Sequence, residues 1–291
     1  MNELAVRFGS ETNLVGIFTS SPQKRAFIAI FLNSGLIHHV GPNRVYVKLA
    51  RKLSEVGVES LRFDFSGIGD SSLGQWTSSG EEKEVSEVKM AMDFLTNLTG
   101  INKFVLVGLC SGASAAFKTA LVDQRIVGCI LLNGIHLQKY EYDIFSKKAS
   151  RRSRVRYFLK NLLYLSKWKR LLSGRSKFYR KWSFQQLQLP RLKSFSKIEK
   201  AENSTESQSL SLVERHEILL RNKVNVLYIF SEGSTSYDLY KLTLKKMINK
   251  HAQFKNLSVS VVEKSDHTFT LVDSQKRLIE AVLNWTEDLS L

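Results

Sequence analysis

Short apolar runs and longer amphipathic stretches alternate along most of the chain. Two strands separated by a polar turn, at residues 5–8 and 14–18, predict an opening hairpin. Six later stretches predict strands, at residues 26–31, 60–65, 104–107, 126–132, 224–230 and 257–262, and those at 26–31 and 126–132 have the composition of buried strands. Apolar residues recur at helical spacing over residues 44–56, 81–98, from 111 onward, 237–250 and 273–289. The alternation predicts an α/β fold with a mainly parallel eight-stranded sheet and helices on both faces.

The alternation stops at residues 139–209, which predicts an insertion into a core made of residues 1–138 and 210–291. Residues 155–172 place apolar positions at helical spacing with Lys and Arg between them, so a basic helical cap is expected. Residues 201–209 are polar and indicate an exposed loop. Because the insertion separates two parallel strands, we expect it beyond their carboxyl ends, where such sheets bind ligands.

The formal net charge of +16 is confined to residues 139–200 of this insertion. Residues 139–200 contain 19 Lys and Arg against 3 Asp and Glu, and the rest of the chain is balanced at 24 of each. The segment is either a solvated cap over the core or a surface for an anionic partner, namely acyl carrier protein, the coenzyme A phosphates or an anionic membrane. Nucleic acid is disfavoured because no recognised nucleic-acid-binding motif accompanies the charge.

Composition indicates a globular cytoplasmic protein. At 291 residues and 43% hydrophobic content, the chain can bury a substantial core. It has no apolar run of about 18 residues, and its first residues lack the basic-then-apolar pattern of a signal peptide. Two cysteines are too few for a disulfide framework. We expect a cytoplasmic location, with peripheral contact at the inner membrane if the basic insertion binds lipid.

A glycine-flanked cysteine carries the clearest chemical signal. Gly108-Leu109-Cys110-Ser111-Gly112 follows a strand and opens a helix, which is typical of a nucleophile elbow with cysteine in place of serine. Bulk at Gly108 or Gly112 would collide with the neighbouring strand and helix. Cys110 is therefore the candidate nucleophile, the alternative being an ordinary buried cysteine. Ser111 is a poorer candidate, because shifting the motif by one puts Leu109 where a glycine is needed.

Further segments resemble a known family. They are Asn-Ser-Gly at 33–35, Val-Gly-Pro-Asn-Arg at 40–44 and Leu-Arg-Phe-Asp-Phe-Ser-Gly-Ile-Gly-Asp-Ser at 61–71. With the elbow, they resemble the bacterial hydrolases associated with exosortase and exopolysaccharide systems, which tend to carry cysteine in the elbow. The resemblance covers most of the chain and is strongest before residue 135. It implies the α/β-hydrolase fold, a place in bacterial polysaccharide biosynthesis, and a nucleophile, acid and histidine in that chain order.

The resemblance assigns the base to His267, which lies between the last strand and the last helix. His267 would take the proton of Cys110, and its neighbour Asp266 is expected to point elsewhere. In the family an acid follows the strand at 224–230, but Ser234 stands in that place here. Asp238 is the first candidate to replace it, Glu232 is another candidate, and a site without an acid is the remaining alternative.

Backbone N–H groups of Ser111 and Leu36 are the expected oxyanion hole. Asp64, Gly67, Gly69 and Asp70 are expected to shape a turn. No cofactor or metal site is predicted. Other cysteine and histidine side chains are expected to be core, solvated or hydrogen-bonded, namely Cys129, His38, His39, His136, His216 and His251.

Cysteine also favours one class of substrate. An acyl-cysteine is a thioester, so forming it from a thioester is nearly thermoneutral, whereas forming it from an ordinary ester is uphill. We therefore expect a thioesterase-like acyl hydrolase or acyltransferase acting on acyl-coenzyme A or acyl carrier protein. The alternatives are a hydrolase of carboxylic esters or lactones, and a catalytically weak hydrolase-fold accessory protein at the membrane.

Overall fold

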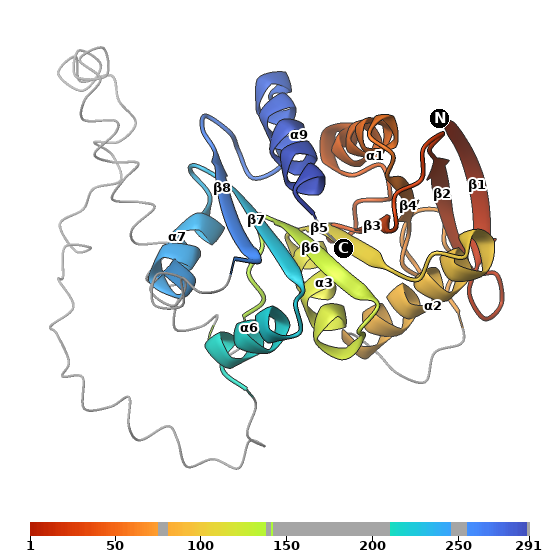
Figure 1. Cartoon of the computed structure of the whole chain (residues 1–291), viewed down its shortest axis with the longest axis horizontal. Helices are drawn as coiled ribbons and strands as arrows, with labels where there is room; N and C mark the ends of the chain where they lie inside the picture. The colour runs from red at the N-terminus through yellow and green to blue at the C-terminus, as the bar shows by residue number, and fades with distance from the viewer. Residues whose placement is uncertain (75–80, 138–140, 142–209, 246–254, 290–291) are drawn as a thin grey trace, which may run out of the picture.

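The strands form one sheet in the order β1-β2-β4-β3-β5-β6-β7-β8 (Figure 1). The structure is a computed structural model that describes residues 1–74, 81–137, 141, 210–245 and 255–289. Strands β3 to β8 run parallel, and β1 and β2 add an antiparallel hairpin at one edge. The strands are β1 (Asn2–Phe8), β2 (Leu14–Ser20), β3 (Ile28–Leu32), β4 (Glu59–Phe63), β5 (Phe104–Leu109), β6 (Ile126–Leu132), β7 (Asn225–Ser231) and β8 (Leu257–Val262). The predicted eight-stranded, mainly parallel sheet is confirmed.

Helices cover both faces of the sheet (Figure 1), and an apolar core lies between the sheet and each layer of helices. Helices α2, α3 and α6 pack on one face, and α1 and α9 pack on the other. The helices are η1 (Pro42–Arg44), α1 (Val45–Glu55), α2 (Glu81–Thr99), α3 (Ser111–Val122), α6 (Leu212–Arg221), α7 (Thr235–Leu242) and α9 (Val272–Glu287). Burial of β3 and β5 along their whole length explains their continuous apolar sequences.

Two elements differ from the sequence prediction. Helix α6 was not predicted, although Ser211 and Glu214 form a capping box at its start. Helix α7 begins at Thr235, two residues before the predicted helix start, because the Ser234 hydroxyl caps it and accepts a hydrogen bond from the Tyr237 N–H at 3.1 Å.

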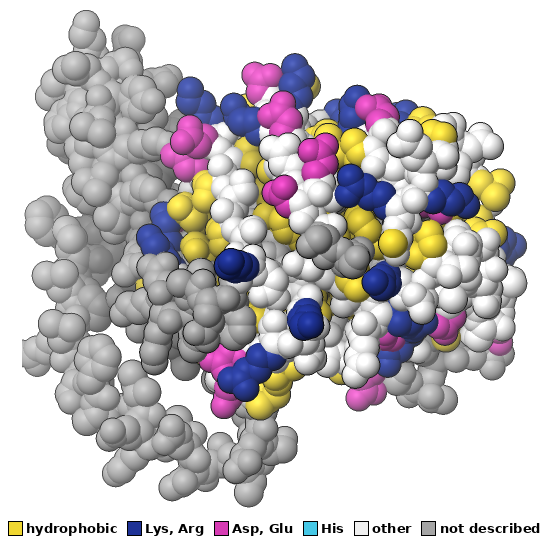
Figure 2. All heavy atoms as spheres, viewed as in Figure 1, with side chains coloured by type: hydrophobic (Ala, Val, Ile, Leu, Met, Phe, Trp, Pro, Cys, Tyr) yellow, Lys and Arg dark blue, Asp and Glu magenta, His cyan; other side chains and the backbone are white. Residues whose placement is uncertain are grey.

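The predicted basic cap lies outside the described residues, apart from Glu141. On the face drawn in Figure 2, Lys and Arg side chains are interspersed with Asp and Glu, in keeping with the balanced charge of the core sequence. Among the described residues, no helix combines the length and the hydropathy needed to span a bilayer.

Candidate active site

Cys110 occupies a strained turn between β5 and α3. Its backbone has φ 57° and ψ −111°, a region that costs a non-glycine residue about 1–3 kcal/mol. The Cys110 N–H donates to the Leu132 carbonyl at 2.9 Å, which fixes the turn to the end of β6. The side chain is exposed. A thiol is thus presented at the N-terminus of α3, as a nucleophile elbow requires.

Glycines make this turn possible, as the sequence predicted. A Cβ on Gly108 would overlap the backbone of Gly112. A Cβ on Gly112 would lie 2.6 Å from the Asn33 carbonyl oxygen and 2.7 Å from that of Leu32. The end of β3 therefore packs directly on the first turn of α3, and the loop that follows β3 begins beside the elbow.

That loop carries the second expected oxyanion donor. The Gly35 N–H donates to Ser111 Oγ at 2.7 Å, and the Ile37 N–H donates to the Ser34 carbonyl at 3.1 Å. Between them, the Leu36 N–H has no acceptor among the described residues. Ser111 is the first residue of α3, so its own N–H has no carbonyl partner within the helix. The loop and the elbow are in contact, and each offers one N–H.

His267 lies in the loop between β8 and α9, and its side chain is exposed. Asn133 Nδ2 donates to the His267 carbonyl at 2.9 Å, and Asn43 Nδ2 donates to the Thr268 carbonyl at 3.2 Å. Asn133 directly follows Leu132, the residue that accepts the Cys110 N–H. Residues 132 and 133 therefore connect the backbone of the elbow to the backbone of the histidine loop.

Asn133 and Asn43 were given no role from the sequence. Each has a positive φ, 44° and 53° respectively, and each side chain ties the histidine loop to a neighbouring loop. The sequence did mark the position of Asn133, because an Asn-Gly pair directly after a buried strand predicts a turn at the carboxyl edge of the sheet.

The surroundings of His267 favour its neutral form. Partial desolvation lowers the pKa of its imidazole, and the nearby negative charge of Asp266 offsets part of this effect. The Asp266 carboxylate accepts hydrogen bonds from the Thr270 N–H at 2.7 Å and the Thr270 hydroxyl at 2.6 Å. Asp266 thus holds the turn that follows the histidine.

The two candidate acids occupy different places. Asp238 is buried in the first turn of α7, with 3% of its surface exposed. Glu232 follows β7, and its carboxylate accepts a hydrogen bond from the Lys264 N–H at 3.1 Å, in the loop that carries His267. Within the described residues, the imidazole of His267 makes no hydrogen bond or ion pair with a carboxylate. Ser234, at the position where the sequence resemblance led us to expect an acid, caps α7.

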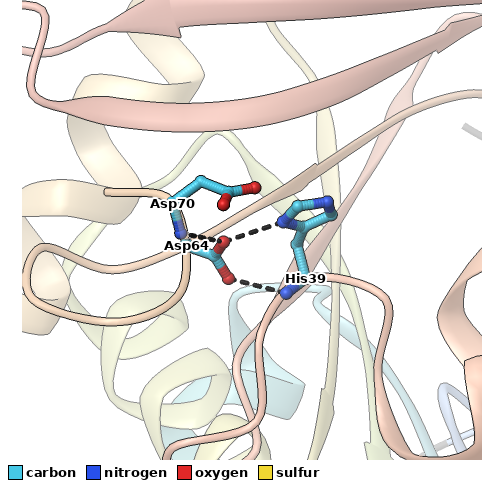
Figure 3. Close-up of side chains that lie close together, drawn as sticks. All are labelled: His39, Asp64 and Asp70. Carbon is cyan, nitrogen blue, oxygen red and sulfur yellow. Dashed lines mark hydrogen bonds and ion pairs between the residues drawn. The ribbon is translucent and has the colours of Figure 1, made fainter. Parts of the chain in front are cut away.

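Asp64 is the centre of a buried hydrogen-bond network beside this site (Figure 3). Its Oδ1 accepts from Asn33 Nδ2 at 2.8 Å and the His39 backbone N–H at 2.6 Å. Its Oδ2 accepts from His39 Nδ1 at 2.8 Å and the Asp70 backbone N–H at 3.1 Å. Burial alone would raise the pKa of Asp64, but these hydrogen bonds outweigh it and hold the pKa below its usual value.

His39, Asp64 and Asp70 have potential metal-ligand atoms within 4.8 Å of one another. The four N–H donors on Asp64 fill the acceptor positions of its carboxylate, so the cluster is a hydrogen-bonded turn. The turn-shaping role predicted for Asp64 is confirmed.

The remaining cysteine and two further histidines belong to the interior. Cys129 is fully buried, and burial raises the pKa of its thiol, as expected of a core residue. His216 donates from Nδ1 to the Leu212 carbonyl at 2.7 Å and accepts at Nε2 from the Tyr228 hydroxyl at 2.7 Å. His136 Nδ1 lies 2.6 Å from Ser114 Oγ. His251 lies outside the described residues.

Similar solved structures include several α/β hydrolases. An esterase from Pyrococcus furiosus matches with a TM-score of 0.57 at 16% identity, covering 99% of this chain and 91% of its own. An α/β serine hydrolase homologue from Coxiella burnetii matches with a TM-score of 0.53 at 15% identity, over 97% of each chain. An α/β serine hydrolase without a lid from Xanthomonas campestris matches with a TM-score of 0.52 at 14% identity, over 98% of this chain and 95% of its own.

No protein-family model matches the chain, and no curated protein matches it. The structural matches show that this chain has the α/β-hydrolase fold, as predicted. The narrower resemblance to exosortase-associated hydrolases stays a prediction.

Proposed function

We propose that this chain is an acyl hydrolase or acyltransferase that works through a thioester on Cys110. The observation that carries the proposal is the strained, exposed cysteine at the N-terminus of α3, in contact with a loop that offers a backbone N–H. Strain of this kind persists where the surrounding structure enforces it, and such positions cluster at active sites. Cys129 is the alternative thiol, and its complete burial excludes it from contact with substrate.

The first half of the reaction forms the acyl-enzyme. His267 takes the thiol proton of Cys110, and Sγ adds to the carbonyl carbon of the substrate. The N–H groups of Ser111 and Leu36 stabilise the negative charge that develops on the carbonyl oxygen. When the intermediate collapses, the bond to the leaving group breaks, and the leaving group takes the proton from His267.

The second half releases the acyl group. Water, or an acceptor alcohol or thiol, gives a proton to His267 and attacks the acyl-cysteine carbonyl. The bond to Cys110 Sγ breaks, and the thiol recovers its proton from His267. Water as the acceptor gives hydrolysis, and any other acceptor gives acyl transfer.

Asp238 remains the proposed acid for His267, with Glu232 as the alternative. A thiol nucleophile depends less on an oriented base than a hydroxyl does, because some thiolate exists near neutral pH. We expect Asp238→Asn or Glu232→Gln, whichever removes the orienting acid, to lower kcat/KM by about 10-fold to 100-fold. Equal activity of both variants and the wild type would support a site without an acid.

Thioesters are the proposed substrates, because exchange between two thioesters is nearly thermoneutral. Acyl-coenzyme A and acyl carrier protein are both anionic thioester carriers, and the basic insertion is the proposed contact for them. Intact-mass measurement after incubation with acyl thioesters, with Cys110→Ala as the control, tests this proposal.

Hydrolysis of carboxylic esters or lactones is the second candidate. The structural match to the Pyrococcus furiosus esterase supports it. Comparing an oxyester and a thioester of the same acyl group distinguishes ester hydrolysis from thioester chemistry, since the thioester proposal requires a higher kcat/KM for the thioester.

A role in polysaccharide assembly is supported by the sequence resemblance. If Cys110→Ala complements a deletion strain fully, the chain acts there as an accessory protein at the membrane.

A further inference from the structure

The loop at residues 33–39 is attached at both ends to a single buried carboxylate. At its start, Asn33 Nδ2 donates to Asp64 Oδ1 at 2.8 Å and to the Ile37 carbonyl at 2.9 Å. At its end, His39 donates to Asp64 through both its backbone N–H and Nδ1. Figure 3 shows the two contacts from His39 on separate oxygens of the carboxylate. Asp64 thereby fixes the span of the loop that carries Leu36.

Asp64 is itself held rigidly. It directly follows β4, a strand paired on both sides, and its side chain is completely buried. Its carbonyl accepts a hydrogen bond from the Ser71 hydroxyl at 2.6 Å, and that same oxygen of Ser71 accepts from the Val15 N–H at 2.8 Å. The network therefore anchors the loop to the sheet.

The opposite side of the loop is fastened to the elbow. Ser111 Oγ accepts the Gly35 N–H at 2.7 Å. Leu36 thus lies between Gly35, which is held by the elbow, and Ile37, which is held by Asn33. Its side chain is 88% exposed, so packing of that side chain does not position the residue.

We propose that Asp64 is a positioning residue of the oxyanion hole, acting through Asn33 and His39, and that the Ser111 hydroxyl fastens the same loop. This inference rests on the proposed function, because it assigns the Leu36 N–H to the developing oxyanion. Donors stabilise a transition state best when they are already in place, and a displacement of about 1 Å costs about 100-fold in rate.

Two reactions of the Cys110 thiol distinguish a loss of oxyanion-hole geometry from a general loss of folded structure. Acylation of Cys110 by an acyl-N-acetylcysteamine thioester needs an oxyanion hole, whereas alkylation by iodoacetamide does not. We expect Asp64→Asn to slow acylation by about 10-fold to 100-fold and to leave alkylation within about twofold of wild type. Ser111→Ala keeps the Ser111 N–H and removes only the hydroxyl, so it tests the loop attachment without disturbing the buried network. We expect it to slow acylation in the same selective way.

Asp70→Asn is the matched control, because it keeps the Asp70 backbone N–H that binds Asp64 and changes only an exposed carboxylate. Acylation at the wild-type rate in this variant supports the proposal. Equal losses in Asp70→Asn and Asp64→Asn would overturn it, since the two carboxylates would then act together, as in holding a cation. Equal losses of acylation and alkylation in both Asp64→Asn and Ser111→Ala would also overturn it. A wild-type protein that is alkylated but never acylated would instead contradict the proposed function.

Discussion

Gly108 packs against the backbone of Gly112 so closely that no side chain fits between them. We expect Gly108→Ala to lower the free energy of unfolding by about 2 kcal/mol or more, because the strand or the helix must move to admit the methyl group. Urea denaturation measures the change. Gly233→Ala is the control, since a Cβ there has no neighbour within 4 Å. Similar stability of the two variants would contradict the described packing of the elbow.

The dependence of kcat/KM on pH tests whether His267 is the base and whether Asp266 influences its pKa. The base must be neutral to accept a proton, and its pKa is lowered, so activity should persist below pH 6.5 and fall only at more acidic pH. Asp266→Asn removes the charge that favours the imidazolium and keeps an oxygen for Thr270. It should therefore move the acidic limb of kcat/KM to still lower pH.

The control for this shift is Asp273→Asn, which changes an exposed carboxylate in the first turn of α9. Its profile should coincide with that of the wild type. An acidic limb that stays in place or moves to higher pH in Asp266→Asn would show that His267 is not the group whose protonation limits the rate.

Ser234 caps the N-terminus of α7. Ser234 stands where the family resemblance expects an acid, and its hydroxyl accepts the Tyr237 N–H. We expect Ser234→Ala to destabilise the protein by about 1 kcal/mol, whereas Ser234→Asp should retain the stability, because serine and aspartate cap helices equally well. Thermal unfolding measures both. Equal stability of the Ala and Asp variants would contradict the capping role.

Packing of α6 against β7 buries His216 completely and lowers its pKa to about 4, chiefly through desolvation. In the unfolded chain the pKa returns to about 6.5, so between these values the unfolded state binds a proton that the folded state does not. Stability should therefore fall by about 3 kcal/mol as the pH drops from 7 to 4.

Urea denaturation at the two pH values isolates this effect. In His216→Gln the dependence of the free energy of unfolding on pH should be weaker by about that amount. The same pH dependence in His216→Gln and wild type would mean that His216 is not buried in its neutral form.

The elements predicted best from the sequence are those whose pattern of apolar and polar residues directly reflects which of their faces are buried. Strands β3 and β5 are apolar along their length because both faces are covered, so their sequences leave no ambiguity. Helix α6 was missed because it follows the long polar stretch, although its capping box was readable. The elbow was predictable because glycine spacing is a local requirement. The links from Asn133 to His267 and from Asp64 to His39 join residues distant in sequence, and no local pattern indicates them.

In the whole molecule, the excess positive charge and the candidate active site belong to different segments of the chain. The sheet-forming core is balanced in charge and contains the candidate site, whereas residues 139–200 carry the whole excess. We expect the full chain to float with vesicles containing phosphatidylglycerol at low salt and to be released near 0.5 M salt, about where the Debye length falls below 5 Å. Flotation with neutral phosphatidylcholine vesicles is the control. Binding to both kinds of vesicle that does not respond to salt would contradict an electrostatic role for the insertion.

Covalent capture of an acyl group is the decisive measurement for Cys110 as the nucleophile. The full chain is mixed with an acyl-coenzyme A, quenched in acid and measured by intact mass, followed by peptide mapping. We expect the mass to rise by one acyl group, located on Cys110 and absent in Cys110→Ala, with release of free coenzyme A. Turnover of the thioester that proceeds equally well in Cys110→Ala, or a wild-type protein that neither gains mass nor releases coenzyme A, would contradict it.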